Sequence, residues 1–65
     1  MPYVNLKTAG ELTEDQKREI ATRFTDVLEE VAGKPRQYTY VVIEEIPRTD
    51  WAIGGQTLAD RAAGK

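Results

Sequence analysis

A run of β-branched and aromatic residues at positions 38–46 constrains the fold more than any other part of the sequence. In a strand, Tyr40 and Val42 lie on one face and Val41 and Ile43 on the other, so both faces are apolar. The chain has only one long helical pattern, and a single helix covers only one face of a sheet. We therefore expect further copies of the same chain to cover the second face.

A strand and a helix precede this segment. Residues 3–8 alternate between an apolar and a polar side, which is the period of a strand. Thr13 and Gln16 match the capping box that begins a helix, and Gly33 followed by Pro35 predicts that the helix ends near residue 32. The apolar stripe of this helix consists of Ile20, Phe24, Val27, Leu28 and Val31. A strand, helix, strand order implies parallel strands joined by a right-handed crossover.

The C-terminal part is less regular. Residues 47–50 have the composition of a turn, and residues 51–55 are too apolar for a free loop. Gly54 and Gly55 can reverse the chain, so we expect a short hairpin there. Residues 56–65 have only weak periodicity, in Leu58, Ala59 and Ala62, and the Gly64-Lys65 end is expected to fray. The prediction is an α/β (α+β) fold over residues 1–65, a single domain. It consists of a β-α-β protomer with a two-stranded parallel sheet, one long helix and a short C-terminal hairpin.

Composition narrows the classes of function. A 65-residue chain without cysteine or histidine has no disulfides and only carboxylates as metal ligands, so self-association is the favoured way to stabilise it. We predict no metal and no cofactor. The net charge of −2, with both signs interspersed, offers no basic surface for nucleic acid. Because no apolar run approaches a membrane span and the N-terminus lacks a secretory pattern, we expect a soluble cytoplasmic protein.

Pro2 is the candidate catalytic residue. An initiator methionine that precedes a residue as small as proline is usually removed, which would leave the secondary amine of Pro2 at the start of the chain. A free proline nitrogen is a base, whereas an acylated one is an amide. The alternative interpretation is that Pro2 is only an edge-strand residue, where proline is tolerated.

A base that removes a proton from carbon needs a pKa near the working pH. The amine of proline is intrinsically more basic than that, so an apolar environment has to lower its pKa. Tyr3, Tyr40, Trp51 and Ile53 are candidates for such an apolar wall. Trp51 is alternatively an anchor for a neighbouring subunit.

In the order and spacing of Pro2 and residues 13–17, 41–45 and 51–55, nearly the whole chain resembles the 4-oxalocrotonate tautomerase family. The resemblance implies a β-α-β protomer whose sheet pairs with a second copy, with such dimers assembling into a hexamer. It also implies that Pro2 acts as general base and acid, moving a proton in a small enol or 2-keto acid.

The chain departs from the family at two positions. The best-known members place arginines where this sequence has Leu12 and Tyr40, which puts a dicarboxylate substrate in doubt. Tyr40 can donate one hydrogen bond, although it is equally well read as a half-buried strand aromatic. Lys7, Arg36 and Arg48 are candidate replacement cations, and each is alternatively a solvated surface charge. Arg48 is favoured because it precedes Trp51 in a segment that could reach a neighbour's pocket.

Two other functions fit the same fold. A protonated Pro2 could act as an acid while a carboxylate activates water, which would hydrate or dehalogenate an unsaturated acid. Glu44 and Glu45 do not form a paired-carboxylate site, because adjacent residues of a strand face opposite sides. Alternatively, the chain is an oligomeric binding protein that has lost the activity together with the arginines.

Overall fold

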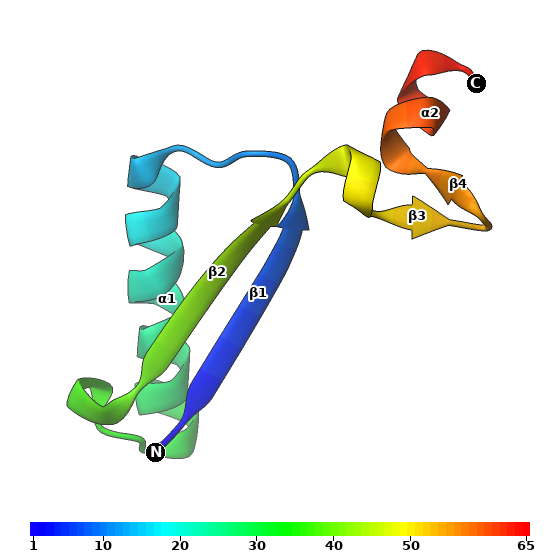
Figure 1. Cartoon of the computed structure of the whole chain (residues 1–65). Helices are drawn as coiled ribbons and strands as arrows, with labels where there is room; N and C mark the ends of the chain where they lie inside the picture. Colours follow the sequence, from blue (N-terminus) through cyan, green and yellow to red (C-terminus); the bar gives the residue numbers. More distant parts are fainter.

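The computed structural model describes residues 1–65 (Figure 1). In chain order the elements are β1 (Tyr3–Ala9), α1 (Glu14–Ala32), η1 (Arg36–Tyr38), β2 (Tyr40–Ile46), η2 (Arg48–Asp50), β3 (Ala52–Ile53), β4 (Gln56–Thr57) and α2 (Leu58–Ala63). The predicted β-α-β order and the short C-terminal hairpin are confirmed.

β1 and β2 form a two-stranded parallel sheet in which Tyr3 is paired with Tyr40 and Ala9 with Ile46. β2 begins two residues later than the sequence predicts, because residues 35–39 form a 3₁₀ turn before the strand starts. The equal length and unbroken register of the two strands place the turn after β1 beside the turn after β2.

The capping signals of α1 act as predicted. The hydroxyl of Thr13 accepts the N–H of Gln16 at 3.1 Å, and the side chain of Gln16 accepts the N–H of Thr13 at 2.9 Å. Gly33 adopts a left-handed conformation with φ 65° and donates its N–H to the carbonyls of Glu29 and Leu28, which ends the helix after Ala32.

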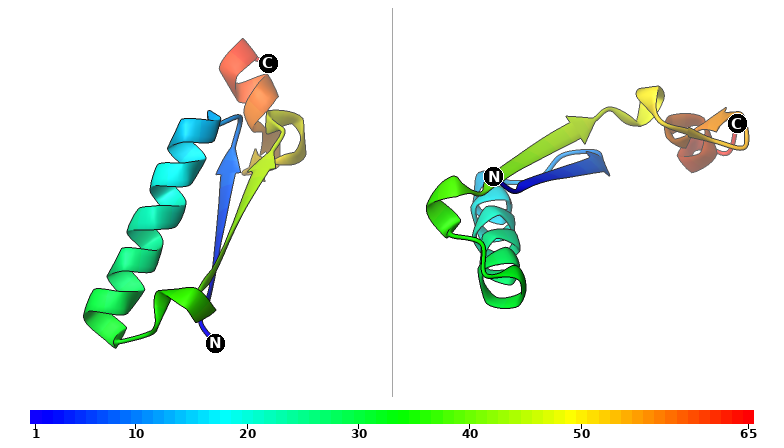
Figure 2. Two further views of the ribbon diagram at one scale, coloured as in Figure 1. Left: turned by 90° about the vertical axis from the view of Figure 1, so that its left-hand side faces the viewer. Right: turned by 90° about the horizontal axis from the view of Figure 1, so that it is seen from below.

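α1 covers one face of the sheet only (Figure 2). Val4, Leu6, Val41 and Ile43 lie half-buried on the helix side. On the opposite face Tyr3 is 63% exposed, Tyr40 55% and Val42 40%. The expectation that one chain leaves an apolar sheet face uncovered is therefore confirmed.

The chain has no buried core of its own, since none of its 65 residues is buried. Its radius of gyration is 15.3 Å, against about 11 Å for a compact chain of this length. The accessible surface is 5001 Å², against about 4,200 Å² for a folded monomer of this mass. The chain therefore leaves exposed roughly 800 Å² that a compact monomer of the same mass would bury.

Residues 47–65, here called the C-terminal arm, extend beyond the end of the sheet (Figure 1). β3 and β4 pair antiparallel around Gly54 and Gly55, both of which have positive φ. The expectation that the chain frays at Gly64 and Lys65 is wrong, because the N–H of Lys65 bonds to the carbonyl of Asp60 at 2.8 Å and α2 is capped at both ends. Thr57 accepts the N–H of Asp60, and Gly64 takes the left-handed conformation that ends a helix. Six residues are too few to show the periodicity by which a helix is recognised in a sequence.

Glu44 and Glu45 face opposite sides of β2, as predicted. Glu44 lies on the uncovered face and accepts a hydrogen bond from Asn5 at 2.9 Å. Glu45 lies on the helix side, where it forms an ion pair with Lys17 and accepts the N–H of Leu12 at 3.0 Å. The bond from Lys17, followed by that from Leu12, lowers the pKa of Glu45. Glu45 thus fastens the turn after β1 to β2.

Replacing Thr13 by alanine should lower the free energy of unfolding by about 1 kcal/mol, because the N–H of Gln16 loses its acceptor. Urea unfolding at a fixed protein concentration measures the change. Thr22→Ala is the matched control on the exposed side of α1, and it should leave stability unchanged or raise it slightly. Equal losses from the two substitutions would contradict the capping role.

The Glu45 bonds predict a pH dependence. A carboxylate whose folded pKa is depressed stabilises the fold above its unfolded pKa, and this contribution is lost as the pH falls through the folded pKa. Glu45→Gln should therefore lower the urea midpoint at pH 7, and the difference from the unsubstituted chain should close below about pH 4. Glu30→Gln changes an exposed carboxylate of α1 and should have no effect at either pH. A difference for Glu45→Gln that does not vary with pH would refute the assignment.

Candidate active site

Pro2 lies immediately before β1, at the end of the sheet where both parallel strands begin. Its carbonyl accepts the N–H of Tyr40 at 3.0 Å, which fixes the carbonyl side of the residue in the sheet. Met1, on the nitrogen side, is 87% exposed. The backbone bond uses only the carbonyl, so any residue could make it and it does not explain why position 2 holds proline. Tyr3 and Tyr40, paired across the sheet, stand next to Pro2 on the uncovered face.

The other predicted site residues lie at the far end of the chain. β2 runs for seven residues, or about 20 Å, from Tyr40 beside Pro2 to Ile46. Arg48, Trp51 and Ile53 follow that far end (Figure 1). The structure therefore brings Pro2 and Tyr40 together and separates both from Arg48, Trp51 and Ile53 of the same chain.

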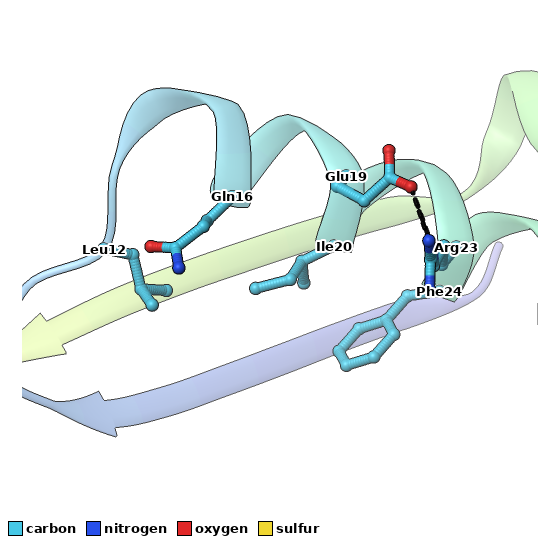
Figure 3. A pocket seen from close by; sticks show the side chains of 6 residues that line it. All are labelled: Leu12, Gln16, Glu19, Ile20, Arg23 and Phe24. Atoms are coloured by element: carbon cyan, nitrogen blue, oxygen red, sulfur yellow. Dashed lines mark hydrogen bonds and ion pairs between the residues drawn. The ribbon is translucent and has the colours of Figure 1, made fainter.

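Two apolar hollows follow the stripe of α1, and Pro2 lines neither of them. The first has a volume of about 340 Å³, and in it Leu12, Ile20 and Phe24 point from the helix side toward the sheet, while Glu19 and Arg23 pair at its outer side (Figure 3). The second, of about 280 Å³, is lined by Val4, Phe24, Val27 and Leu28. Only β1 contributes to it from the sheet. Leu12, at one of the family's arginine positions, thus supplies apolar surface and no charge.

A third hollow, of about 440 Å³, lies where β1 and β2 end. It is lined by Gly10, Glu11, Glu45, Ile46, Pro47 and Arg48. The guanidinium of Arg48 packs on the backbone of Gly10, where a β-carbon would lie 3.6 Å from its Nε and Nη2 atoms. That Glu11 and Arg48 line one hollow was not predicted from the sequence. The signal that could have found this pair is the equal length of the two parallel strands, which brings their following turns together.

Arg48 differs in its electrostatics from the other candidate cations. Arg36 bonds to Asp26 at 2.8 Å and Glu29 at 2.9 Å, and these hydrogen bonds raise its pKa. Lys7 lies 3.4 Å from a carboxylate oxygen of Glu44 on the uncovered face. Arg48 forms no ion pair. Of the three, only Arg48 makes no ion pair within the chain, although Glu11 and Glu45 line the same hollow.

The chain gathers no group of three acidic side chains that could hold a metal ion. Neither α1 nor α2 combines the length and the hydropathy that crossing a bilayer requires.

Comparison with known proteins gives the family. The sequence profile described as "Tautomerase enzyme" matches residues 2–61. A probable tautomerase of Bacillus cereus is 38% identical over 61 residues, which cover 94% of this chain and 100% of the relative. The 2-hydroxymuconate tautomerase of Bacillus subtilis is 33% identical over 60 residues, covering 92% of this chain and 97% of the relative.

Solved structures share the fold. TomN, a 4-oxalocrotonate tautomerase homologue in the tomaymycin biosynthetic pathway, has a TM-score of 0.90 and 24% identity over 95% of each chain. A heterohexamer 4-oxalocrotonate tautomerase from Chloroflexus aurantiacus has a TM-score of 0.84 and 23% identity, covering 92% of this chain and 97% of that one. The resemblance seen in the sequence is confirmed, and the chain belongs to the tautomerase family of isomerases.

Proposed function

We propose that this chain is a tautomerase of a small enol or 2-keto acid, in which the amine of Pro2 is the general base and acid once Met1 is removed. The observation that carries the proposal is the position of Pro2, which opens the family match and lies at the free end of β1. Its carbonyl is held by Tyr40, and the exposed Met1 is accessible for removal. The freed nitrogen would then be fixed in place by the sheet.

The pKa of that amine has to be lowered from the ordinary α-amine value of about 8 or above. Within one chain Pro2 is only half-buried, and Tyr3 and Tyr40 beside it are both more than half exposed. Further burial that lowers the pKa would come from a neighbouring subunit. The apolar arm residues Trp51 and Ile53 are free to supply it, since Ile53 is 58% exposed and Trp51 is only half-buried.

The free edge of β1 offers the pairing surface for a second copy. The N–H of Tyr40 bonds to Pro2 and that of Gly10 to Ile46, so the even-numbered residues of β1 turn their backbone groups toward β2. The groups of the odd-numbered residues point outward, because the direction alternates along a strand. α1 lies closer to β2 than to β1, which leaves this edge open.

An antiparallel pair of β1 strands centred on Leu6 fits this edge. In this arrangement Asn5 is hydrogen-bonded to the partner's Lys7, and Tyr3 to the partner's Ala9. All four residues are odd-numbered, so their backbone groups point outward. A twofold axis through Leu6, perpendicular to the sheet, keeps both α1 helices on the same side. Each helix then covers the other chain's hollow beside β1, where Val27 is 54% exposed.

This dimer leaves the opposite sheet face, with Tyr3, Tyr40 and Val42, uncovered. Three such dimers that bury these faces against one another give the expected hexamer. The Chloroflexus aurantiacus relative, a heterohexamer, supports assembly at this scale.

A second candidate activity rests on the neighbouring Glu11 and Arg48. If the partner's turn lies beside Pro2, the carboxylate of Glu11 could activate water while protonated Pro2 donates a proton. The enzyme would then hydrate an unsaturated acid such as propynoate, with water adding across the triple bond to give an enol that tautomerises to 3-oxopropanoate. The third reading, an oligomeric binding protein, requires that Met1 be retained or that turnover be absent.

Pro2→Ala should lower kcat/KM for phenylenolpyruvate by about 100-fold or more, because it replaces the secondary amine and its positioning. Intact mass shows whether Met1 is absent, and a form that retains Met1 should be inactive. Native mass spectrometry of each form checks that assembly is unchanged. Full turnover with Met1 attached would exclude Pro2 as the base, and propynoate turnover that exceeds enol turnover would favour the hydratase.

A further inference from the structure

We infer that Arg48 of the partner subunit holds the substrate carboxylate at Pro2, and that the site therefore selects monocarboxylates. The inference rests on the proposed function of Pro2. It adds the residue that binds the substrate, the subunit from which this residue comes, and the class of substrate.

The first step is the identity of the cation. Among the basic residues without an ion pair, Lys34 follows α1 as an exposed point charge, and Arg61 and Lys65 lie at the C-terminal end of the arm. Of these four unpaired basic residues, only Arg48 lines a hollow. A guanidinium presents a planar fork that matches a carboxylate with two parallel hydrogen bonds, which an ammonium does not.

The second step is the placement of this guanidinium. Arg48 follows Pro47 and opens η2, and its guanidinium lies 3.6 Å from the point that a β-carbon of Gly10 would occupy. Gly10 has φ 88° and no side chain, which leaves this space to the guanidinium. The guanidinium therefore lies beside the turn that follows β1.

The third step is the twofold pairing of β1. With Leu6 opposite the partner's Leu6, the residue opposite Pro2 is the partner's Gly10, which carries Arg48. Within one chain Arg48 lies about 20 Å from Pro2, at the other end of β2. Only the Arg48 of a partner can therefore bind a substrate that Pro2 also reaches, and one chain alone has an incomplete site.

The fourth step is the substrate class. One guanidinium binds one carboxylate, and the two family arginine positions hold Leu12 and Tyr40, which carry no positive charge. Glu11 of the same turn would repel a second carboxylate. Tyr3 and Tyr40 stand beside Pro2, and Ile46 and Pro47 line the hollow of Arg48, so the substrate is the enol of a 2-keto monocarboxylate with an apolar substituent. In ketonisation the amine of Pro2 takes the proton from the enol oxygen and then delivers it to carbon, so that Pro2 ends in the protonation state in which it began.

The first test compares two substrates that differ by one charge, phenylenolpyruvate and the enol of its methyl ester. Arg48→Gln should lower kcat/KM about 10- to 100-fold for the acid and less than about twofold for the ester. Arg48→Lys should recover part of the loss, and Lys34→Gln should change neither substrate. Equal losses for acid and ester, or no loss for either, would overturn the inference.

The second test establishes which subunit supplies Arg48. Pro2→Ala and Arg48→Gln chains are unfolded together in equal amounts, refolded, and assayed with phenylenolpyruvate. Random assembly places intact Pro2 opposite intact Arg48 in about one quarter of sites, so activity should rise to about a quarter of the unsubstituted enzyme. The control mixes Arg48→Gln with the double variant, which brings no Arg48, and should show no rise.

Activity of the mixture no greater than the average of its parts would overturn the inference. The proposed function is judged separately by Pro2→Ala alone. If Pro2→Ala is inactive while the mixture gains nothing, the tautomerase proposal stands and the role of Arg48 falls. If Pro2→Ala is fully active, both fall.

Discussion

The parallel pairing of β1 with β2 through one helical crossover is the constraint on which the rest of the structure depends. Two parallel strands need one helix to connect them, and that helix covers one face and leans toward β2. The other sheet face, the edge of β1 and part of the α1 stripe stay open, and no residue is buried. Under the proposed function, the second copy that covers these surfaces would also enclose Pro2, so stability and the active site would depend on the same interface.

The same pairing separates the parts of the site. In a parallel sheet both strands start at one end, so Pro2 lies beside Tyr40 and both following turns lie together about 20 Å away. In the proposed dimer, a twofold axis reverses one copy and returns the far turns to Pro2. That dimer would bring together groups that a single chain holds at its two ends, and binding of the substrate carboxylate would be a property of the interface.

Sequence patterns predicted most of the fold because each element carries its own local signals. Thr13 and Gln16 set the start of α1, Gly33 sets its end, and alternation identifies β1 and β2. α2 was missed because six residues show no clear period. Pro2 could be selected from its chemistry, but the contact of Arg48 with Gly10 joins residues far apart in the sequence. It depends on strand register, which no local pattern records.

Amide hydrogen exchange along β1 tests the central claim, that the outer edge of β1 pairs with a second copy, most directly. In one chain the N–H groups of Val4, Leu6 and Thr8 face β2, and those of Tyr3, Asn5 and Lys7 face outward. The account predicts slow exchange for both sets at assay concentration. Fast exchange of the Tyr3, Asn5 and Lys7 amides beside a protected even-numbered set would contradict it.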